Sequence, residues 1–151
     1  MLNTEFPVKK RRIMVEIPEK DLRDMFGWFR QGMDEWAVRT YLLKNLRVLE
    51  EGLNIDNFIG FNIYFMKKAE VDMLFRKDAT YYLVETKQKG KYSRGWNQLK
   101  ACVGSFIDEM IEHGEEPREI VAILATSSAQ SVRKLTIQKF DFWFEPEEPP
   151  V

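Results

Sequence analysis

Two acidic residues and a lysine, Asp72, Glu85 and Lys87, are the side chains whose types and spacing best fit hydrolytic chemistry. Asp72 lies in one predicted strand, and Glu85 and Lys87 end the next strand. Side chains alternate between the faces of a strand, so Glu85 and Lys87 point the same way. Carboxylates bind hard cations and a lysine stabilises anionic oxygens, so this set suits metal-dependent cleavage of phosphodiester bonds.

The turn between the two strands decides whether these groups meet. If Asp78–Ala79 is a two-residue turn, Lys77 opposes Thr80. Counting back along both strands, Asp72 then directly opposes Glu85. Opposed residues of an antiparallel pair have Cβ atoms about 5 Å apart, and like charges there are destabilising. A divalent cation, Lys87 or a neighbouring base would remove that repulsion, whereas a loop of odd length would place Asp72 on the other face.

Two further polar residues lie on predicted helices. Glu35 is in line with Leu42 and Leu46, at i+7 and i+11, so it belongs to the core-facing stripe of its helix. It either completes the acidic site or only stabilises the first helical turn beside a predicted cap at Asp34, and both readings stay open. Gln98 lies at the margin of an apolar stripe, on a helix that follows a basic segment.

The remaining pattern predicts the elements that hold these groups. An apolar run from Ile120 to Ala125 is typical of a central strand, and Gly60 indicates a bulge in another strand. The order of elements predicts an α/β (α+β) domain with a mixed central sheet of about five strands flanked by helices. Helices are expected from Pro18, from Asp34 to about Leu49, from Ser93 to about His113 and over Ser127–Lys134, and strands over Phe58–Phe65, Glu70–Arg76, Thr80–Gln88, Ile120–Ala125 and Phe140–Phe144.

Composition limits the class of protein. The chain has 151 residues, of which 44% are apolar and 31% charged, which is typical of one globular domain. We expect an N-terminal extension with a short helix over residues 1–31, a core domain over 32–144 and an acidic, proline-rich tail over 145–151. The single cysteine, Cys102, excludes an internal disulfide. The single histidine, His113, excludes a multi-histidine site, so a metal would be held by oxygen ligands.

Charge and hydropathy point to a partner other than a membrane. No apolar run is long enough to span a bilayer and the N-terminus lacks a signal-peptide core, so the cytoplasm, or the host cytoplasm for a viral protein, is the expected compartment. The net charge is −1, but basic residues cluster over Lys9–Arg12 and Lys87–Lys100. The first cluster is equally well a solvated arm or a phosphate contact.

The pair Val71-Asp72 and Glu85-Thr86-Lys87 resembles the signature of the PD-(D/E)XK nuclease superfamily, with Val71 in place of the nominal proline. The chain looks closest to archaeal NucS-type and RecB-like catalytic domains and to archaeal-virus nucleases. The resemblance covers residues from about 34 to 144 and includes the glutamine of the following helix. It implies a restriction-endonuclease-like core and a Mg²⁺- or Mn²⁺-dependent nuclease that hydrolyses DNA in repair, recombination or viral genome processing.

The resemblance also implies a role for each site residue. Asp72, Glu85 and the backbone carbonyl of Thr86 would bind the metal, and Lys87 would position or help to deprotonate the attacking water. Such a metal lowers the pKa of a water and neutralises charge on the phosphate.

The same resemblance implies roles for residues around the metal site and along the DNA. Glu35 would reach the metal through a water, and Gln98 would orient the metal or the phosphate. A base could stack on Tyr92 or Trp96, although a core position is favoured for Trp96. Contacts to DNA are expected from Lys89, Lys91, Tyr92, Arg94 and Lys100.

The sequence is also compatible with two other classes of protein. One is a non-catalytic nucleic-acid-binding domain that retains the nuclease fold. The other is a structural module in which Glu85 and Lys87 form a surface ion pair of little energetic value. A homodimer through Phe142, Trp143 and Phe144 was also considered, although a sheet strand is favoured for these residues.

Overall fold

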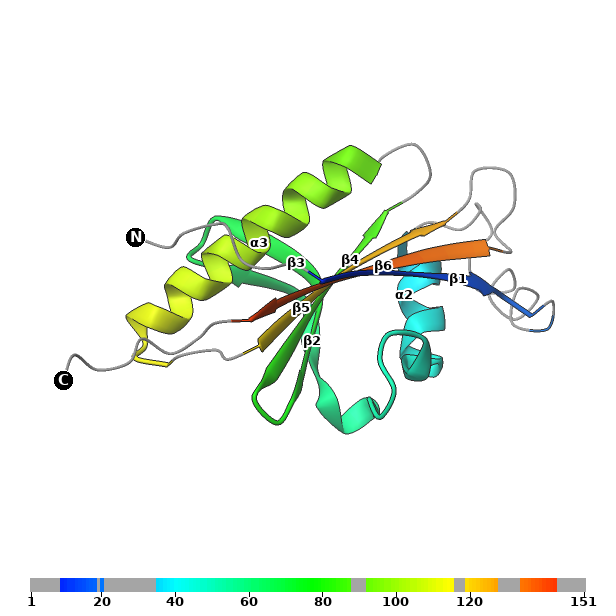
Figure 1. Cartoon of the computed structure of the whole chain (residues 1–151), viewed down its shortest axis with the longest axis horizontal. Helices are drawn as coiled ribbons and strands as arrows, with labels where there is room; N and C mark the ends of the chain where they lie inside the picture. The colour runs from blue at the N-terminus through cyan, green and yellow to red at the C-terminus, as the bar shows by residue number, and fades with distance from the viewer. Residues whose placement is uncertain are drawn as a thin grey trace.

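The fold is a single six-stranded sheet with a helix packed on each face (Figure 1). The structure is a computed structural model and describes residues 9–18, 20, 35–87, 92–115, 119–127 and 134–143. The elements in these ranges are β1 (Lys9–Glu16), α2 (Glu35–Lys44), the 3₁₀ helices η1 (Leu46–Val48) and η2 (Ile55–Asn57), β2 (Phe58–Phe65), β3 (Ala69–Lys77), β4 (Thr80–Lys87), α3 (Tyr92–Glu112), β5 (Glu119–Ser127) and β6 (Lys134–Trp143).

The sheet has the order β1-β6-β5-β4-β3-β2. Only β4 and β5 are parallel among the described strands, so the sheet is mixed, and α3 makes the crossover between them. The expected mixed α/β class is therefore confirmed, with six strands in place of about five. The position of β5 beside β4 in the middle of the sheet explains its nearly continuous apolar sequence.

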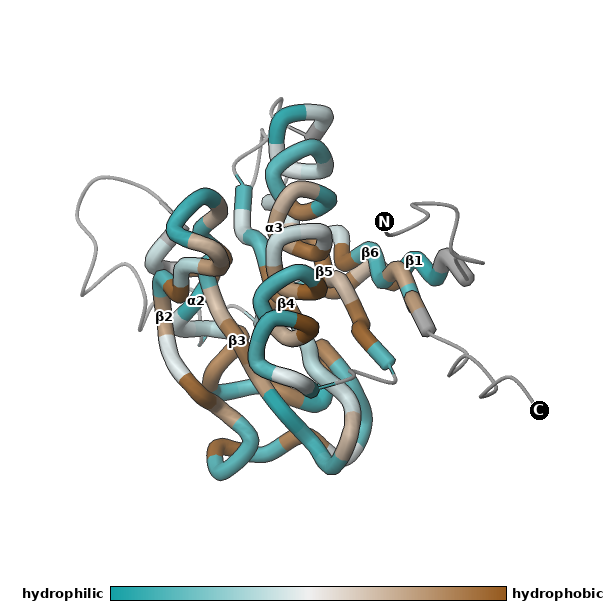
Figure 2. The backbone as a smooth tube through the Cα atoms, turned by 90° about the vertical axis from the view of Figure 1, so that its left-hand side faces the viewer, coloured by the Kyte–Doolittle hydropathy of each residue, from teal (hydrophilic) through white to brown (hydrophobic). Residues whose placement is uncertain are grey.

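Two apolar cores lie on the two faces of the sheet. On one face, Val38 and Leu42 of α2 pack against the strands. On the other face, Leu99 and Val103 of α3 do the same. The tube in Figure 2 shows α3 alternating between hydrophilic and hydrophobic residues, as a helix with one buried face does. Trp96 stacks on Phe140 with the ring centroids 3.9 Å apart, so it belongs to the core as favoured from the sequence.

Several predicted elements are confirmed. β2 has the expected bounds, and its register shifts between Phe58 and Gly60, where a bulge was expected. α3 runs within one residue of its predicted ends. The predicted α-helix to Leu49 is wrong beyond Lys44, because Asn45 interrupts it. The Asn45 side chain donates a 3.0 Å hydrogen bond to the carbonyl of Tyr41, which competes with the helical backbone.

The basic run at the N-terminal end lies in a strand that the sequence pattern did not indicate. β1 pairs antiparallel with β6 at the edge of the sheet, where basic residues are tolerated on the open side. Arg11 is not a free arm, because it ion-pairs with Asp141 at 3.1 Å and Glu50 at 3.4 Å. Lys139 lies on the same sheet face, is only 4% exposed and contacts Glu50 at 3.6 Å.

The last strand is longer than predicted. β6 begins at Lys134. Its polar residues Gln138 and Lys139 conceal the strand pattern in the sequence, although both are buried. Ser127 ends β5 and Lys134 begins β6, so the predicted helix between them is wrong at both ends. Phe142 is buried in β6, as the strand reading predicts.

Some predictions concern residues outside the described ranges. These are the helix after Pro18, the cap at Asp34, the interior of the predicted helix before β6, Phe144, the boundary at 31/32 and the tail over 145–151. Across the part of the chain that the structure describes, no helix has both the length and the apolar character needed to cross a membrane.

Candidate active site

The turn on which the site depends has the predicted length. Asp78–Ala79 is a two-residue turn, and β3 and β4 pair in unbroken register from its ends to Met73 opposite Val84. The paired register ends there, and Asp72 and Glu85 are the next residues of the two strands. The predicted two-residue turn is therefore confirmed, and the two acidic residues both come directly after the paired region.

The two strands part at Asp72. Val71 packs in the core on the α3 face and Met73 in the core on the α2 face, so the side-chain alternation of β3 changes between them. Asn62, at this level of β2, has a positive φ of 52°. In place of a backbone partner, Asp72 Oδ2 accepts hydrogen bonds from the Thr86 amide at 2.8 Å and the Thr86 hydroxyl at 3.0 Å. A side chain therefore bridges the strands where the backbone ladder stops.

Arg39 of α2 completes the surroundings of Asp72. Its Nη2 lies 2.7 Å from Asp72 Oδ1, and both side chains are buried. Arg39 Nη1 donates to Asn62 Oδ1 at 3.1 Å and Nε donates to Thr86 Oγ1 at 3.4 Å. The guanidinium also lies 4.5 Å from the ring centroid of Trp36. The Arg39 guanidinium consequently offsets the negative charge of Asp72, and the hydrogen bonds hold this carboxylate in one orientation.

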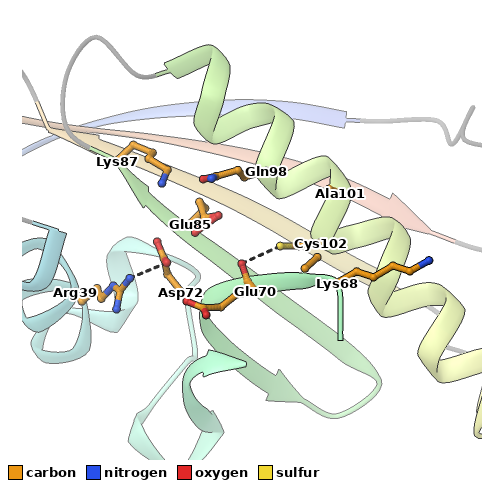
Figure 3. A pocket seen from close by; sticks show the side chains of 10 residues that line it. Arg39, Lys68, Glu70, Asp72, Glu85, Lys87, Gln98, Ala101 and Cys102 are labelled. Atoms are coloured by element: carbon orange, nitrogen blue, oxygen red, sulfur yellow. Dashed lines mark hydrogen bonds and ion pairs between the residues drawn. The ribbon is translucent and has the colours of Figure 1, made fainter. Parts of the chain in front are cut away.

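A pocket of about 460 Å³ opens between β3, β4 and α3 (Figure 3). Four of the predicted site residues meet in it, namely Asp72, Glu85, Lys87 and Gln98. Glu85 is only 2% exposed, and Gln98 points from α3 toward the space beside Lys87 and Glu85 (Figure 3). The full lining is Arg39, Lys68, Ala69, Glu70, Asp72, Glu85, Lys87, Gln98, Ala101 and Cys102.

The other predicted residues do not join this group in the described structure. Arg94 and Lys100 are exposed on α3 and do not line the pocket, and Lys100 Nζ lies 5.5 Å from the Trp96 ring centroid. Glu35 begins α2 and Tyr92 begins α3, but their side chains lie outside the described part. The segment that contains Lys89 and Lys91 also lies outside it.

Sequence reasoning missed three charged residues of the lining, Arg39, Lys68 and Glu70. Arg39 had a usable signal, because it precedes Leu42 and Leu46 at i+3 and i+7 and so lies on the same inward stripe that drew attention to Glu35. The sequence gives no comparable signal for Glu70 and Lys68, because their positions depend on where β3 leaves β4.

The donor set fits a hard divalent cation. The pocket lining offers the carboxylates of Glu70, Asp72 and Glu85 and the side-chain amide of Gln98. Thr86, whose backbone carbonyl was predicted as a ligand, is fully buried and is not among the lining residues. No group of three His, Cys, Asp or Glu side chains within the described ranges is arranged to hold a metal ion. Mg²⁺ retains several waters and binds proteins through one or two carboxylates, so Asp72 and Glu85 meet its usual requirement.

Cys102 does not add a soft ligand to this set. Its Sγ donates to the carbonyl of Glu70 at 3.1 Å. Burial raises the pKa of the Cys102 thiol to about 12, and the negative charges of Glu85, Asp72 and Glu70 add to the effect. The thiolate is the form that binds metals and attacks electrophiles, so this side chain is a neutral donor.

We expect Cys102 to react with iodoacetamide at pH 8 at least roughly 100-fold more slowly in the folded chain than in urea. Mass spectrometry of timed samples measures both rates. Because the folded pKa lies above the usual value of 9.0, this thiol also makes the free energy of unfolding fall as the pH rises from about 9 to about 12. Equal alkylation rates with and without urea would contradict the assignment.

Gly95 lets α3 pass close to the end of β4. A Cβ atom at Gly95 would lie 2.7 Å from Lys87 Cγ and 2.9 Å from Leu124 Cδ1, closer than side chains tolerate. The absence of a side chain at Gly95 therefore allows the helix to hold Gln98 over the strand that carries Glu85.

Gly95→Ala is expected to lower the free energy of unfolding by about 1–3 kcal/mol, because overpacking outweighs the better helix propensity of alanine. Gly104→Ala in the same helix is the matched control, since a Cβ there would meet nothing within 4 Å. That control should be neutral or stabilising by up to about 1 kcal/mol. Urea unfolding measures both values, and equal stabilisation by the two substitutions would disprove the close approach.

The site thus joins Asp72, Glu85, Lys87 and Gln98 from three separate elements, with Arg39 added from a fourth. Asp72 is held by Arg39 and Thr86, while Glu85 and Lys87 extend from the end of a buried strand. Comparisons of the chain with protein-family models, with curated proteins and with solved structures found no match.

Proposed function

We propose that this protein is a Mg²⁺- or Mn²⁺-dependent deoxyribonuclease of the PD-(D/E)XK type. The observation that carries the proposal is the meeting of Asp72, Glu85, Lys87 and Gln98 in one pocket at the point where β3 leaves β4. In a structural module with a surface ion pair between Glu85 and Lys87, Glu85 would be exposed to solvent. Glu85 is instead buried, so this alternative accounts poorly for the site.

Three groups of the chain would hold the divalent cation. These are the carboxylates of Asp72 and Glu85 and the backbone carbonyl of Thr86. The Thr86 amide points to Asp72, and the amide and carbonyl of a strand residue face the same neighbouring strand. The Thr86 carbonyl is therefore expected to face the same gap. When bound, the cation supplies positive charge that stabilises an anionic phosphate and lowers the pKa of a water.

Lys87 and Gln98 supply the remaining polar chemistry. The Lys87 side chain is half-buried in the pocket, beside the face that carries Glu85. Its ammonium group offsets the negative charge that develops on the phosphate, and it orients a water by donating a hydrogen bond. The Gln98 amide has two donors and an acceptor, so it fixes the position of a phosphate oxygen or a water without adding charge.

DNA is the proposed substrate because the flanking positive charge suits a phosphate backbone. β4 ends at Lys87 and α3 begins at Tyr92, and the first turn of a helix presents amide groups that favour anions. Arg94 is exposed in that turn, where it would contact a neighbouring phosphate without reading sequence. We place the activity in DNA repair, recombination or viral genome processing, as the superfamily resemblance suggests.

The direct test incubates the purified chain with labelled single-stranded, duplex, flap and junction DNA in Mg²⁺ or Mn²⁺. We expect cleavage of at least one substrate, complete loss with excess EDTA and restoration by added Mg²⁺. Glu112→Gln, an exposed change at the end of α3, should cleave like the wild type. Binding without cleavage in gel-shift experiments on every substrate would instead support the non-catalytic nucleic-acid-binding domain.

A further inference from the structure

Arg39 is a buried cation at the wall of the pocket, and the proposed roles above do not use it. Its side chain is 6% exposed, and its closest charged partner among the described residues is Asp72 at 2.7 Å. The Asp72 oxygen that faces Arg39 is Oδ1, and the other oxygen accepts from Thr86. The carboxylate proposed to bind a divalent cation is already engaged on both oxygens.

The charges in the pocket lining balance. Three acidic residues, Glu70, Asp72 and Glu85, face three basic residues, Arg39, Lys68 and Lys87. Lys68 is exposed and extends away from the other groups in Figure 3, so water screens its charge. Arg39 is buried and held by hydrogen bonds, so its charge acts on Asp72 at short range with little screening.

We infer that Arg39 is a positioning residue that fixes Asp72 and keeps the affinity of the pocket for divalent cations low. This inference rests on the proposed function, because it concerns the metal of that same site. A carboxylate has about four lone-pair positions, so Asp72 is able to serve Arg39, Thr86 and a cation together. The cation then meets a carboxylate whose charge Arg39 already offsets, which weakens the attraction.

This arrangement has a consequence for substrate binding. A divalent cation adds positive charge to a balanced pocket, whereas a phosphodiester adds negative charge. Each ligand therefore improves the affinity of the other, and such coupling is reciprocal. The pocket would therefore favour the cation and the phosphate together over the cation alone.

The test measures Mn²⁺ binding without DNA by isothermal titration calorimetry. Arg39→Gln removes the charge, and Arg39→Lys keeps it while losing the forked geometry. We expect Arg39→Gln to bind Mn²⁺ at least about tenfold more tightly than the wild type, because one buried positive charge is gone. We expect Arg39→Lys to stay within about threefold of the wild type, because a cation remains beside Asp72.

Glu85→Gln separates failure of this inference from failure of the proposed function. If the wild type binds Mn²⁺, Glu85→Gln does not, and Arg39→Gln binds no more tightly than the wild type, only the inference about Arg39 is overturned. If neither the wild type nor Arg39→Gln binds Mn²⁺, the metal site itself is disproved and the proposed function falls with it. Circular dichroism verifies that each variant is folded.

A measurement on the unaltered chain decides the question even if Arg39→Gln does not fold. The NMR signal of the Arg39 Nε–H group is assigned by its loss in Arg39→Lys and followed during titration with Mg²⁺. We expect it to move and to saturate with the same dissociation constant that calorimetry gives for Mg²⁺. A signal that stays in place while Mg²⁺ binds would overturn the inference, because Arg39 would then not sense occupation of Asp72.

Discussion

Replacing Glu85 with glutamine is expected to lower Mg²⁺-dependent DNA cleavage by roughly 10²–10³-fold or more, which is the usual cost of removing one group that stabilises transition-state charge. The substitution keeps the size of the side chain and removes only the negative charge. Initial rates on the best substrate of the wild type, at saturating Mg²⁺, measure the effect. Retention of activity within about threefold would remove Glu85 from the proposed machinery.

The same substitution should leave the fold largely intact, because glutamine fits the space of glutamate. Asp72 and Glu85 line the same pocket, and like charges near one another raise the free energy of the metal-free chain. Glu85→Gln removes one of these two charges. Loss of activity together with an unchanged or higher Tm in EDTA is typical of a functional residue, because function and stability often conflict at such sites.

The sequence predicted the hairpin that carries the site because local chemistry determines its geometry. Asp78 adopts a φ of 55° in the turn, a conformation that aspartate accepts more readily than most residues. With two residues in the turn, Lys77 lies opposite Thr80, and this pair sets the register of both strands. The level of Asp72 and Glu85 in the sheet followed by counting, and the position of Gln98 followed from helical spacing.

Other features depend on contacts between distant segments and had weaker signals. β1 consists largely of charged residues, and its place beside β6 depends on the pairing of Arg11 with Asp141 and Glu50. The early part of β6 was concealed by Lys139, whose buried ammonium group rests on Glu50. Local propensity cannot reveal a charged strand whose partners lie far away in the chain.

The partner of Asp72 on α2 was also missed in the sequence. The predicted repulsion between Asp72 and Glu85 called for a divalent cation, Lys87 or a neighbouring base to neutralise it, but Arg39 was not identified as that base. The structure shows that Arg39 performs part of this task from α2. Through its two oxygens, Asp72 consequently ties α2 to β4.

These contacts lead to the expectation that Asp72→Asn destabilises the fold. In the native chain both oxygens of Asp72 accept, one from Arg39 and the other from the Thr86 amide. Asparagine has only one oxygen, so its NH₂ group must face one of these donors. Arg39 also remains buried without a countercharge. Breaking a buried pair in this way costs about 3–5 kcal/mol of the free energy of unfolding.

Urea unfolding in EDTA measures this cost, and a double-mutant cycle with Arg39→Met assigns it. For a chain of this length the loss corresponds to a fall in Tm of roughly 10 °C. We expect the double variant Asp72→Asn/Arg39→Met to be more stable than Asp72→Asn alone, since methionine removes the stranded charge and retains apolar packing beside Trp36. If the two single effects add with no coupling, the ion pair is not what holds Asp72 in place. If they do not add, loss of activity in Asp72→Asn must be corrected for unfolding before it is read as chemistry, which makes Glu85→Gln the cleaner test of catalysis.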